Sequence, residues 1–280
     1  MLRLYRDQVR IALCPDRLIT VHSKAGLRPR IIAKQVHRYA RVESTGSESN
    51  WQAALPVLQA ALDNPDWKNA DATLIISNHF VRFLLLPWNE VALTDAEKLA
   101  LLQDRFAEVY GEASAAWELR LHEGSFGASS LASAVDQGLL DQVKGIFKAS
   151  MLRLKSIQPY LMTIFNACRS DLDNEAAWFV LAEEGMSCVG LLRNGQWQSI
   201  RLRRTESDDG LDEAMVALER EKLRIDTGNE SRKVFVFSPE NACVSPIQQG
   251  ELTIYPLQPK SCALLSKAEM YGYAMAVAGM

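Results

Sequence analysis

The sequence lacks the short motifs that mark several classes of enzyme. It contains no GxxxxGK[ST], GxGxxG, GxSxG or HExxH pattern, which argues against the common phosphate-binding loops, the nucleophile elbow and the zinc-protease helix. None of its five cysteines forms a CxxC pair: Cys14, Cys168, Cys188, Cys243 and Cys262. This scatter favours reduced thiols over a disulfide framework or a zinc site.

Long apolar runs and a strong charge are also missing. No stretch approaches the roughly 18 to 20 apolar residues of a membrane-spanning helix, and the N-terminus has no uninterrupted apolar core of signal-peptide length. The net charge of −3 gives no electrostatic case for nucleic acid or an anionic membrane as a partner. Arg201, Arg203 and Arg204 alternate as one strand face would, which favours a solvated face. We therefore expect a cytoplasmic protein without direct membrane insertion.

What is present is the composition of a soluble globular protein. The 280 residues are 48% hydrophobic and 23% charged, enough to bury the core of one large domain or two ordinary ones.

Two stretches of the chain share one plan. VRIALC-PDR-LITVHS-KAG-LRPRIIA begins at residue 9, and WFVLA-EEGM-SCVGLL-RNG-QWQSIRL begins at residue 178. Each predicts a strand, a sharp turn, a second strand, a tight turn ending in glycine, and a third strand. A helix and a further buried strand follow in each half, TLIIS in one and KVFVF in the other. A duplicated βββαβα plan is typical of two-lobed proteins of the actin/hexokinase architecture, built on mixed α/β sheets.

The segment between these halves predicts an additional module. Thr94 and Glu97 form a capping box at the start of an amphipathic helix. The strands WELRLHE and SSLASAVD and a second helix, GLLDQVKGIFKASML, follow. We expect an inserted α+β subdomain at about 92–152, within a first ribonuclease-H-like lobe at 1–158. The second ribonuclease-H-like lobe is expected at 159–280.

At this level the sequence resembles a known family, the actin-like type IV pilus assembly proteins (PilM) and the cytoplasmic domain of type II secretion protein L. The resemblance rests on VRFLLLPWNEVALTDAEKLALLQDRFAEVYG, on AVDQGLLDQVKGIFKASMLRLKSIQP, and on LLRNGQWQSIRLRR with the helix at 211–225. It covers nearly the whole chain in element order. It implies a two-lobed actin-like ATPase fold.

The sequence departs from this family at the positions that contact nucleotide. The resemblance implies an Asp-Xaa-Gly turn in each lobe, whose glycine lets the backbone approach phosphate. The first-lobe position holds Leu13-Cys14-Pro15-Asp16, and Pro15 has no N–H to donate. The second holds Ala182-Glu183-Glu184-Gly185, and Phe237-Ser238-Pro239-Glu240-Asn241-Ala242 replaces a Gly-Gly turn. Like charges about 4 Å apart at an effective dielectric of about 20 repel by about 4 kcal/mol, so we expect no nucleotide cofactor.

Two classes of function remain open. The first is a non-catalytic scaffold that holds partners at the cytosolic face of a type IV pilus or type II secretion-like assembly. The second is a nucleotide-binding switch or kinase-like ATPase of the actin/hexokinase superfamily. A carboxylate metal cluster of Asp16, Glu183 and Glu184 is a further alternative, although acidic residues are common in hairpin turns because turns are solvated. The degraded turns favour the scaffold.

The resemblance also implies a partner, a membrane-anchored assembly protein that offers a short cytosolic tail. We expect that tail to bind beside the inserted subdomain by strand addition, which would place this chain at the inner membrane through the partner. Trp88 and Tyr110 are the candidate partner-binding residues. Phe80, Phe83 and Trp88 alternate on one strand, which favours burial of this cluster in a core, and burial is the alternative for the leucines before Trp88 as well.

Overall fold

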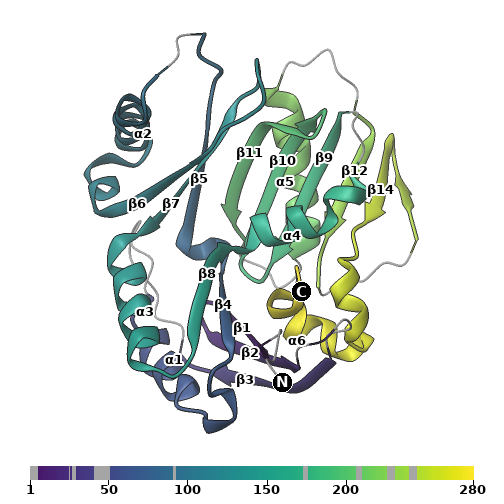
Figure 1. Cartoon of the computed structure of the whole chain (residues 1–280). Coiled ribbons are helices and arrows are strands. Elements are labelled where there is room, and N and C mark those ends of the chain that lie inside the picture. The colour runs from purple at the N-terminus through teal and green to yellow at the C-terminus, as the bar shows by residue number, and fades with distance from the viewer. Residues whose placement is uncertain are drawn as a thin grey trace. The chain divides into compact units, whose positions relative to one another are not determined.

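The computed structural model describes residues 6–24, 26, 30–40, 51–90, 93–172, 176–205, 210–225, 231–239 and 245–280. The chain forms two compact units (Figure 1). The first unit comprises residues 1–81, 136–167 and 259–280, and the second comprises 82–135 and 168–258.

The first unit is built on a five-stranded mixed sheet with the order β3-β2-β1-β4-β8. Its strands are β1 (Gln8–Leu13), β2 (Arg17–Lys24), β3 (Arg30–Arg38), β4 (Asp71–Ile76) and β8 (Arg153–Pro159). The first three strands form an antiparallel meander, while β4 runs parallel to β1 and β8 runs parallel to β4. β1 and β2 are almost entirely buried because helices cover the sheet.

Four helices belong to the first unit: α1 (Ala54–Leu62), α3 (Gln137–Ala149), α4 (Tyr160–Cys168) and α6 (Lys267–Val277). α1 and α3 pack against each other and against β2 and β8. α6 packs against β1 and β2 (Figure 1). Short 3-10 helices lie at Pro65–Trp67, Asn78–Phe80 and Lys260–Leu264.

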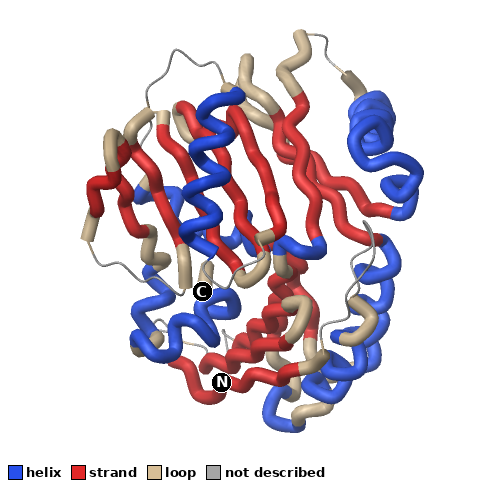
Figure 2. Tube along the Cα trace, turned by 180° about the vertical axis from the view of Figure 1, so that it is seen from behind, coloured by secondary structure: helices blue, strands red, loops and turns tan. Residues whose placement is uncertain are grey.

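The second unit contains a six-stranded sheet with the order β11-β10-β9-β12-β14-β13. Its strands are β9 (Ala177–Glu183), β10 (Met186–Arg193), β11 (Gln196–Arg204), β12 (Lys233–Phe237), β13 (Ile247–Gln249) and β14 (Leu252–Pro256). α5 (Gly210–Arg224) lies across β9 and β10, as Figure 2 shows from behind. Val180, Val189 and Leu218 are among the buried side chains of the core between them.

The two sheets confirm the predicted duplication. Each has its third, second and first strands in antiparallel order, followed by a fourth strand parallel to the first. This shared order is the topology expected of two ribonuclease-H-like halves. β8 and β13 are strands that the sequence analysis did not predict.

A three-stranded sheet of order β5-β7-β6 also belongs to the second unit, except for the first residue of β5 and the last residue of β7. Its strands are β5 (Val81–Leu86), β6 (Trp117–His122) and β7 (Ser130–Asp136), and α2 (Asp95–Tyr110) packs on one face. The predicted capping box is present, with the Glu97 amide donating to Thr94 Oγ1 at 3.3 Å and the Thr94 amide to Glu97 Oε2 at 2.8 Å. Short 3-10 helices at Gly111–Ala116 and Arg169–Asp171 complete the unit.

The compact units differ from the continuous segments 1–158 and 159–280 expected from sequence. α6 returns to the first sheet because its C-terminal carbonyls bind Arg10 on β1. α3, expected in the subdomain at about 92–152, packs instead on α1 and β8. Both exchanges involve contacts between residues far apart in the chain, which strand and helix patterns do not encode.

Candidate functional site

The turn between β1 and β2 occupies the first-lobe position where the related fold would approach phosphate. The backbone N–H of Cys14 donates to the carbonyl of Arg17 at 3.0 Å, and Pro15 has no N–H. The Tyr39 hydroxyl donates to the Cys14 carbonyl and lies 3.2 Å from the Arg17 carbonyl. Burial raises the pKa of Tyr39, which keeps this hydroxyl protonated as a donor. The turn is therefore closed by contacts with its own neighbours.

The carboxylate of Asp16 in this turn also has partners. Its Oδ2 lies 3.2 Å from the Arg17 guanidinium and 3.9 Å from that of Arg38. The Arg17 guanidinium in turn lies over the Tyr271 ring, 5.5 Å from its centroid. The negative charge of Asp16 is thus compensated within the first unit by two arginines.

The turn between β9 and β10 is the corresponding position of the second unit. Glu183 and Glu184 are half-buried there, and Gly185 adopts a φ of 71°, which a residue with a Cβ rarely tolerates. The Thr205 amide donates to the Gly185 carbonyl at 3.2 Å, which ties the turn to the end of β11. The turn therefore carries two carboxyl side chains where the resemblance implies a phosphate-binding turn.

The third position for which the resemblance implies contact with nucleotide follows β12. Phe237 and Ser238 are buried at the end of that strand. Glu240, Asn241 and Ala242, which complete the predicted glycine-free turn, lie outside the described residues. Within the ranges that are described, no group of three or more His, Cys, Asp or Glu side chains could hold a metal ion.

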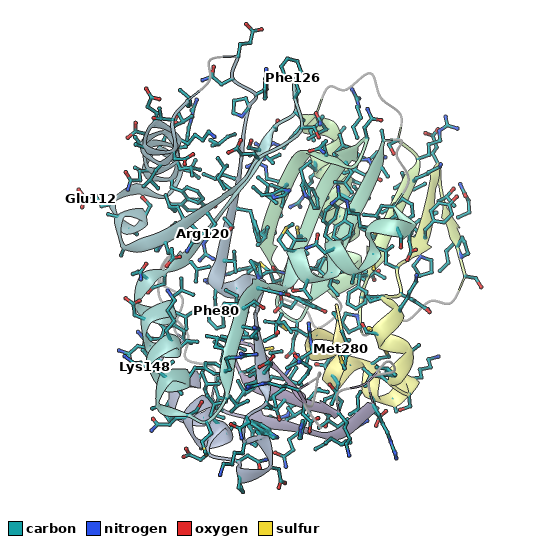
Figure 3. All side chains as sticks on the ribbon, in the orientation of Figure 1. Phe80, Glu112, Arg120, Phe126, Lys148 and Met280 are labelled. Atoms are coloured by element: carbon teal, nitrogen blue, oxygen red, sulfur yellow. The ribbon has the colours of Figure 1, made fainter. Side chains whose placement is uncertain are left out.

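Trp88 lies just beyond the end of β5 and is 40% exposed. Its indole packs on the ring of Phe126, with the two centroids 4.9 Å apart. Phe126 is 92% exposed and lies at the tip of the loop between β6 and β7 (Figure 3). The side chain of Gln196 donates to Ser125 Oγ at 3.2 Å, which attaches this loop to the β10–β11 turn. We call Trp88 and Phe126 the exposed aromatic pair.

Sequence reasoning missed Phe126, because an aromatic residue in the Gly/Ser-rich stretch EGSFGASS has no periodic pattern that marks it. The interpretation of Phe80 and Phe83 as core residues is confirmed, since they are 4% and 6% exposed.

Tyr110 occupies a different environment, at the C-terminal end of α2. It stacks on Phe106 at 5.9 Å and meets the edge of Trp117 at 5.2 Å, so it belongs to the core beneath α2. Burial raises the pKa of Tyr110, and the charge of Arg82 at the start of β5 opposes that rise. Since the four residue steps of β5 from Arg82 to Leu86 span about 13 Å, Trp88 and Tyr110 lie toward opposite ends of β5. The structure does not bring the two predicted residues together in one patch.

Solved structures share this arrangement of elements. The PilM-PilN type IV pilus biogenesis complex aligns with a TM-score of 0.63 over 97% of this chain and 96% of that one, at 12% identity. The chain has an actin-like fold. A Bacteroides thetaiotaomicron protein with an actin-like ATPase fold and unknown function aligns with a TM-score of 0.56 over 83% and 82% of the two chains, at 10% identity.

The cytoplasmic domain of EpsL is a third similar structure. EpsL is an inner membrane component of the type II secretion system of Vibrio cholerae, and this domain aligns with a TM-score of 0.53 over 82% and 81% of the two chains, at 10% identity. These likenesses confirm, for the fold, the resemblance stated from the sequence. No family model matches the sequence, and no curated protein matches it. No helix among the described residues is long and apolar enough to cross a bilayer.

Proposed function

We propose that this chain is a non-catalytic actin-like scaffold that holds a membrane-anchored partner at the cytosolic face of a pilus or secretion-like assembly. In this proposal the protein is cytoplasmic, uses no nucleotide cofactor and reaches the inner membrane only through its partner. The partner contributes a short cytosolic tail.

The observation that carries the proposal is the closed first-lobe turn. A phosphate-binding turn needs free N–H groups that point at the ligand. Here Pro15 lacks one, and the Cys14 N–H is used by Arg17. The Tyr39 hydroxyl donates a hydrogen bond to the backbone carbonyl of Cys14 in the turn. Opening this turn for phosphate would break these contacts. These features favour a scaffold over a nucleotide switch.

The similarity to a PilM-PilN complex and to a domain of an inner membrane secretion component supports the choice of assembly. Fold alone does not determine function, so the interaction surface has to come from this chain's own residues. The exposed aromatic pair meets that requirement. Large aromatic side chains are enriched at the energetic centres of interfaces, and Phe126, which is 92% exposed, buries little of its ring on folding of the monomer.

Calorimetry tests the nucleotide half of the proposal. We expect no heat of binding when ATP and magnesium are titrated to millimolar concentration into the full chain. A saturable isotherm with a micromolar dissociation constant at the first-lobe turn would overturn the scaffold and favour the nucleotide-binding switch. Tyr39→Phe identifies that origin, because it removes the hydroxyl that closes the turn and would change such an isotherm.

Co-purification tests the partner half. We expect Trp88→Ala with Phe126→Ala to lower recovery of a membrane-anchored protein from the native host about tenfold or more, as removal of an interface centre does. A synthetic peptide of that protein's cytosolic tail should bind the wild-type chain and not the double variant. Leu223→Ala is the matched control, since Leu223 is 88% exposed on α5. Equal tail binding by the double variant would place the partner surface elsewhere.

A further inference from the structure

The outer face of α5 carries two apolar side chains that the described part of the chain leaves exposed. Val216 is 52% exposed and Leu223 is 88% exposed. They are seven positions apart in the sequence, which is about two helical turns, so they share one stripe of the helix surface. The opposite face of α5 packs on β9 and β10 through Ala214, Ala217 and Leu218. Figure 2 shows α5 on the outside of the six-stranded sheet.

A cavity of about 310 Å³ lies beside this stripe, at the edge of the six-stranded sheet. It is bounded by α5, the start of β10 and the end of the edge strand β11. Val216 belongs both to the stripe and to the cavity wall, which also includes Ala217 and Arg220 of α5 and Arg203 of β11. The methylene stems of arginine side chains pack against apolar groups. A leucine that sits on Val216 therefore reaches the mouth of the cavity.

The two ends of α5 carry opposite charges. Asp212 and Glu213 lie in its first turn, and Lys222 and Arg224 lie in its last turn. Two such helices packed antiparallel bring the acidic turn of one beside the basic turn of the other, and their dipoles attract as well. Parallel packing would instead bring like charges together. The charge pattern therefore favours antiparallel pairing of α5 with a second α5.

An antiparallel pairing centred between Glu219 and Arg220 also matches the apolar stripe. Val216 and Leu223 lie equally far from that centre along the helix, so Val216 of each copy meets Leu223 of the other. A twofold contact of this kind forms each pair twice. Leu223, the most exposed of these side chains, is then covered by the second copy.

Charged residues flank the stripe in this arrangement. Helical spacing puts Glu213 and Arg224 on the same side of the stripe, so Glu213 of each copy faces Arg224 of the other. Glu219 and Arg220 lie at the centre and meet their own counterparts. Lys222, whose Nζ lies 3.2 Å from Glu219 Oε1, offsets the first of these repulsions. Because salt screens exposed charges, the apolar contacts decide the sign of the interaction.

We propose that α5 is a self-association surface, on which a second copy of this chain packs its own α5 antiparallel and places Leu223 on Val216 at the mouth of the cavity. The contact uses one face of a 15-residue helix, about 22 Å long. It is therefore smaller than a standard interface of about 1,600 Å², and the dimer is weak and reversible. The surface is independent of the scaffold proposal, because it uses neither the phosphate-position turns nor the exposed aromatic pair.

Sedimentation equilibrium of the full chain, from micromolar to millimolar concentration, tests the association. We expect the mean mass to rise with concentration from that of one chain toward that of two. Leu223→Ala should weaken the dimer by about tenfold or more, as removal of an anchor side chain does, and Val216→Ala should weaken it less. Ile247→Ala is the matched control, since Ile247 is 45% exposed on β13, outside α5. It should leave the association unchanged.

Charge reversal tests the antiparallel order. Glu213→Lys and Arg224→Glu should each weaken the dimer severalfold, and the two changes together should restore it, because each reversed residue again faces an opposite charge. Parallel pairing predicts no such rescue. Melting curves of all variants show whether a change in association reflects a change in folding. Arg224 is exposed, so Arg224→Glu decides the matter even if Glu213→Lys lowers the melting temperature.

Two outcomes would overturn the surface. One is a wild-type chain that keeps the mass of a single copy at millimolar concentration, even if α5 then captures a different protein. The other is a dimer that Leu223→Ala and Ile247→Ala affect equally. Neither outcome bears on the scaffold, since Leu223→Ala should lose self-association and still bind the tail peptide. Trp88→Ala with Phe126→Ala should lose the peptide and still self-associate.

Discussion

The guanidinium of Arg10 on β1 donates from Nε to the backbone carbonyl of Ala276 at 2.7 Å. Its other nitrogens donate to the carbonyls of Gly279, at 3.3 Å, and Ala278. These carbonyls lie at and just beyond the C-terminus of α6, where backbone acceptors lack partners within the helix and the dipole is negative. Burial lowers the pKa of Arg10 to about 10, so the group remains charged at neutral pH. One side chain thus joins the two ends of the chain.

Replacement of Arg10 by methionine should lower the free energy of unfolding by about 2–4 kcal/mol, because buried carbonyls lose a charged donor. Urea unfolding should show a lower midpoint with an unchanged slope. Amide exchange should accelerate in α6 more than in α5. Arg10→Lys keeps the positive charge without the planar guanidinium. Its unfolding midpoint should therefore lie between those of the wild type and Arg10→Met. An unchanged midpoint in Arg10→Met would show that the bonds contribute nothing net.

Glu269 stabilises the start of α6 in a manner that depends on pH. It bonds to Lys34 on β3, and it accepts from the Ser266 amide at 2.9 Å in a capping box. These bonds lower its pKa from 4.5 to about 2. A carboxyl with a depressed folded-state pKa contributes its stability above the unfolded value and loses it as the pH falls toward the folded value. The contribution should therefore be complete above pH 4.5 and decline between pH 4.5 and 2.

Thermal unfolding of wild type and Glu269→Gln at pH 6, 4 and 3 measures this contribution. The difference in melting temperature between the wild type and Glu269→Gln should be largest at pH 6 and should become smaller at pH 4 and again at pH 3. Asp63→Asn is the control, since this acid lies at the end of α1, away from α6. A gap that stays constant with pH would mean that the carboxylate charge is not what stabilises the helix.

Gly190 on β10 is covered by the indole of Trp197. A Cβ added at Gly190 would lie 2.5 Å from the Trp197 ring and 2.8 Å from the Ser199 carbonyl oxygen. We expect Gly190→Ala to destabilise the protein by about 1–3 kcal/mol, the usual cost of overpacking, and to alter tryptophan fluorescence. Gly145→Ala should stabilise the protein by about 0.5–1 kcal/mol, because that exposed helical position has open space for a Cβ. Equal effects of the two changes would contradict the packing argument.

Replacement of Tyr110 and replacement of Trp88 by alanine should lower the free energy of unfolding by different amounts. Tyr110→Ala removes a ring from the core beneath α2 and should lower the free energy of unfolding by about 2–4 kcal/mol. Trp88→Ala removes a half-exposed ring and should lower it by about 1 kcal/mol at most. Chemical unfolding of both variants provides the comparison. A large loss for Trp88→Ala would mean that its contact with Phe126 is structural rather than a surface for a partner.

The duplicated plan was predictable because it is local. Turn residues, alternating strands and a capping box act within a few residues of one another, and each constrains its own segment directly. The two sheets accordingly have the strand order that the repeat predicts. The lack of an N–H donor in the β1–β2 turn could also be predicted from the sequence, because proline at position 15 has no backbone N–H in any fold.

Other features depend on pairs of residues that the chain separates widely. Tyr39 closes the first-lobe turn across 25 residues, and Arg10 binds α6 across more than 260. Phe126 becomes notable only beside Trp88. No periodicity encodes such pairs, because burial and partner choice are decided when segments pack together.

The arginines of β11 show the same division. By itself the sequence determined that Arg201, Arg203 and Arg204 stand on a strand, and it favoured a solvated face for them. Tertiary structure decided that Glu221 on α5 lies 3.6 Å from Arg201, while Arg203 and Arg204 form no ion pair with a described residue. The physical reason is that a charge acquires its role from the groups within about 4 Å of it, and for these residues those groups come from a helix that follows later in the chain.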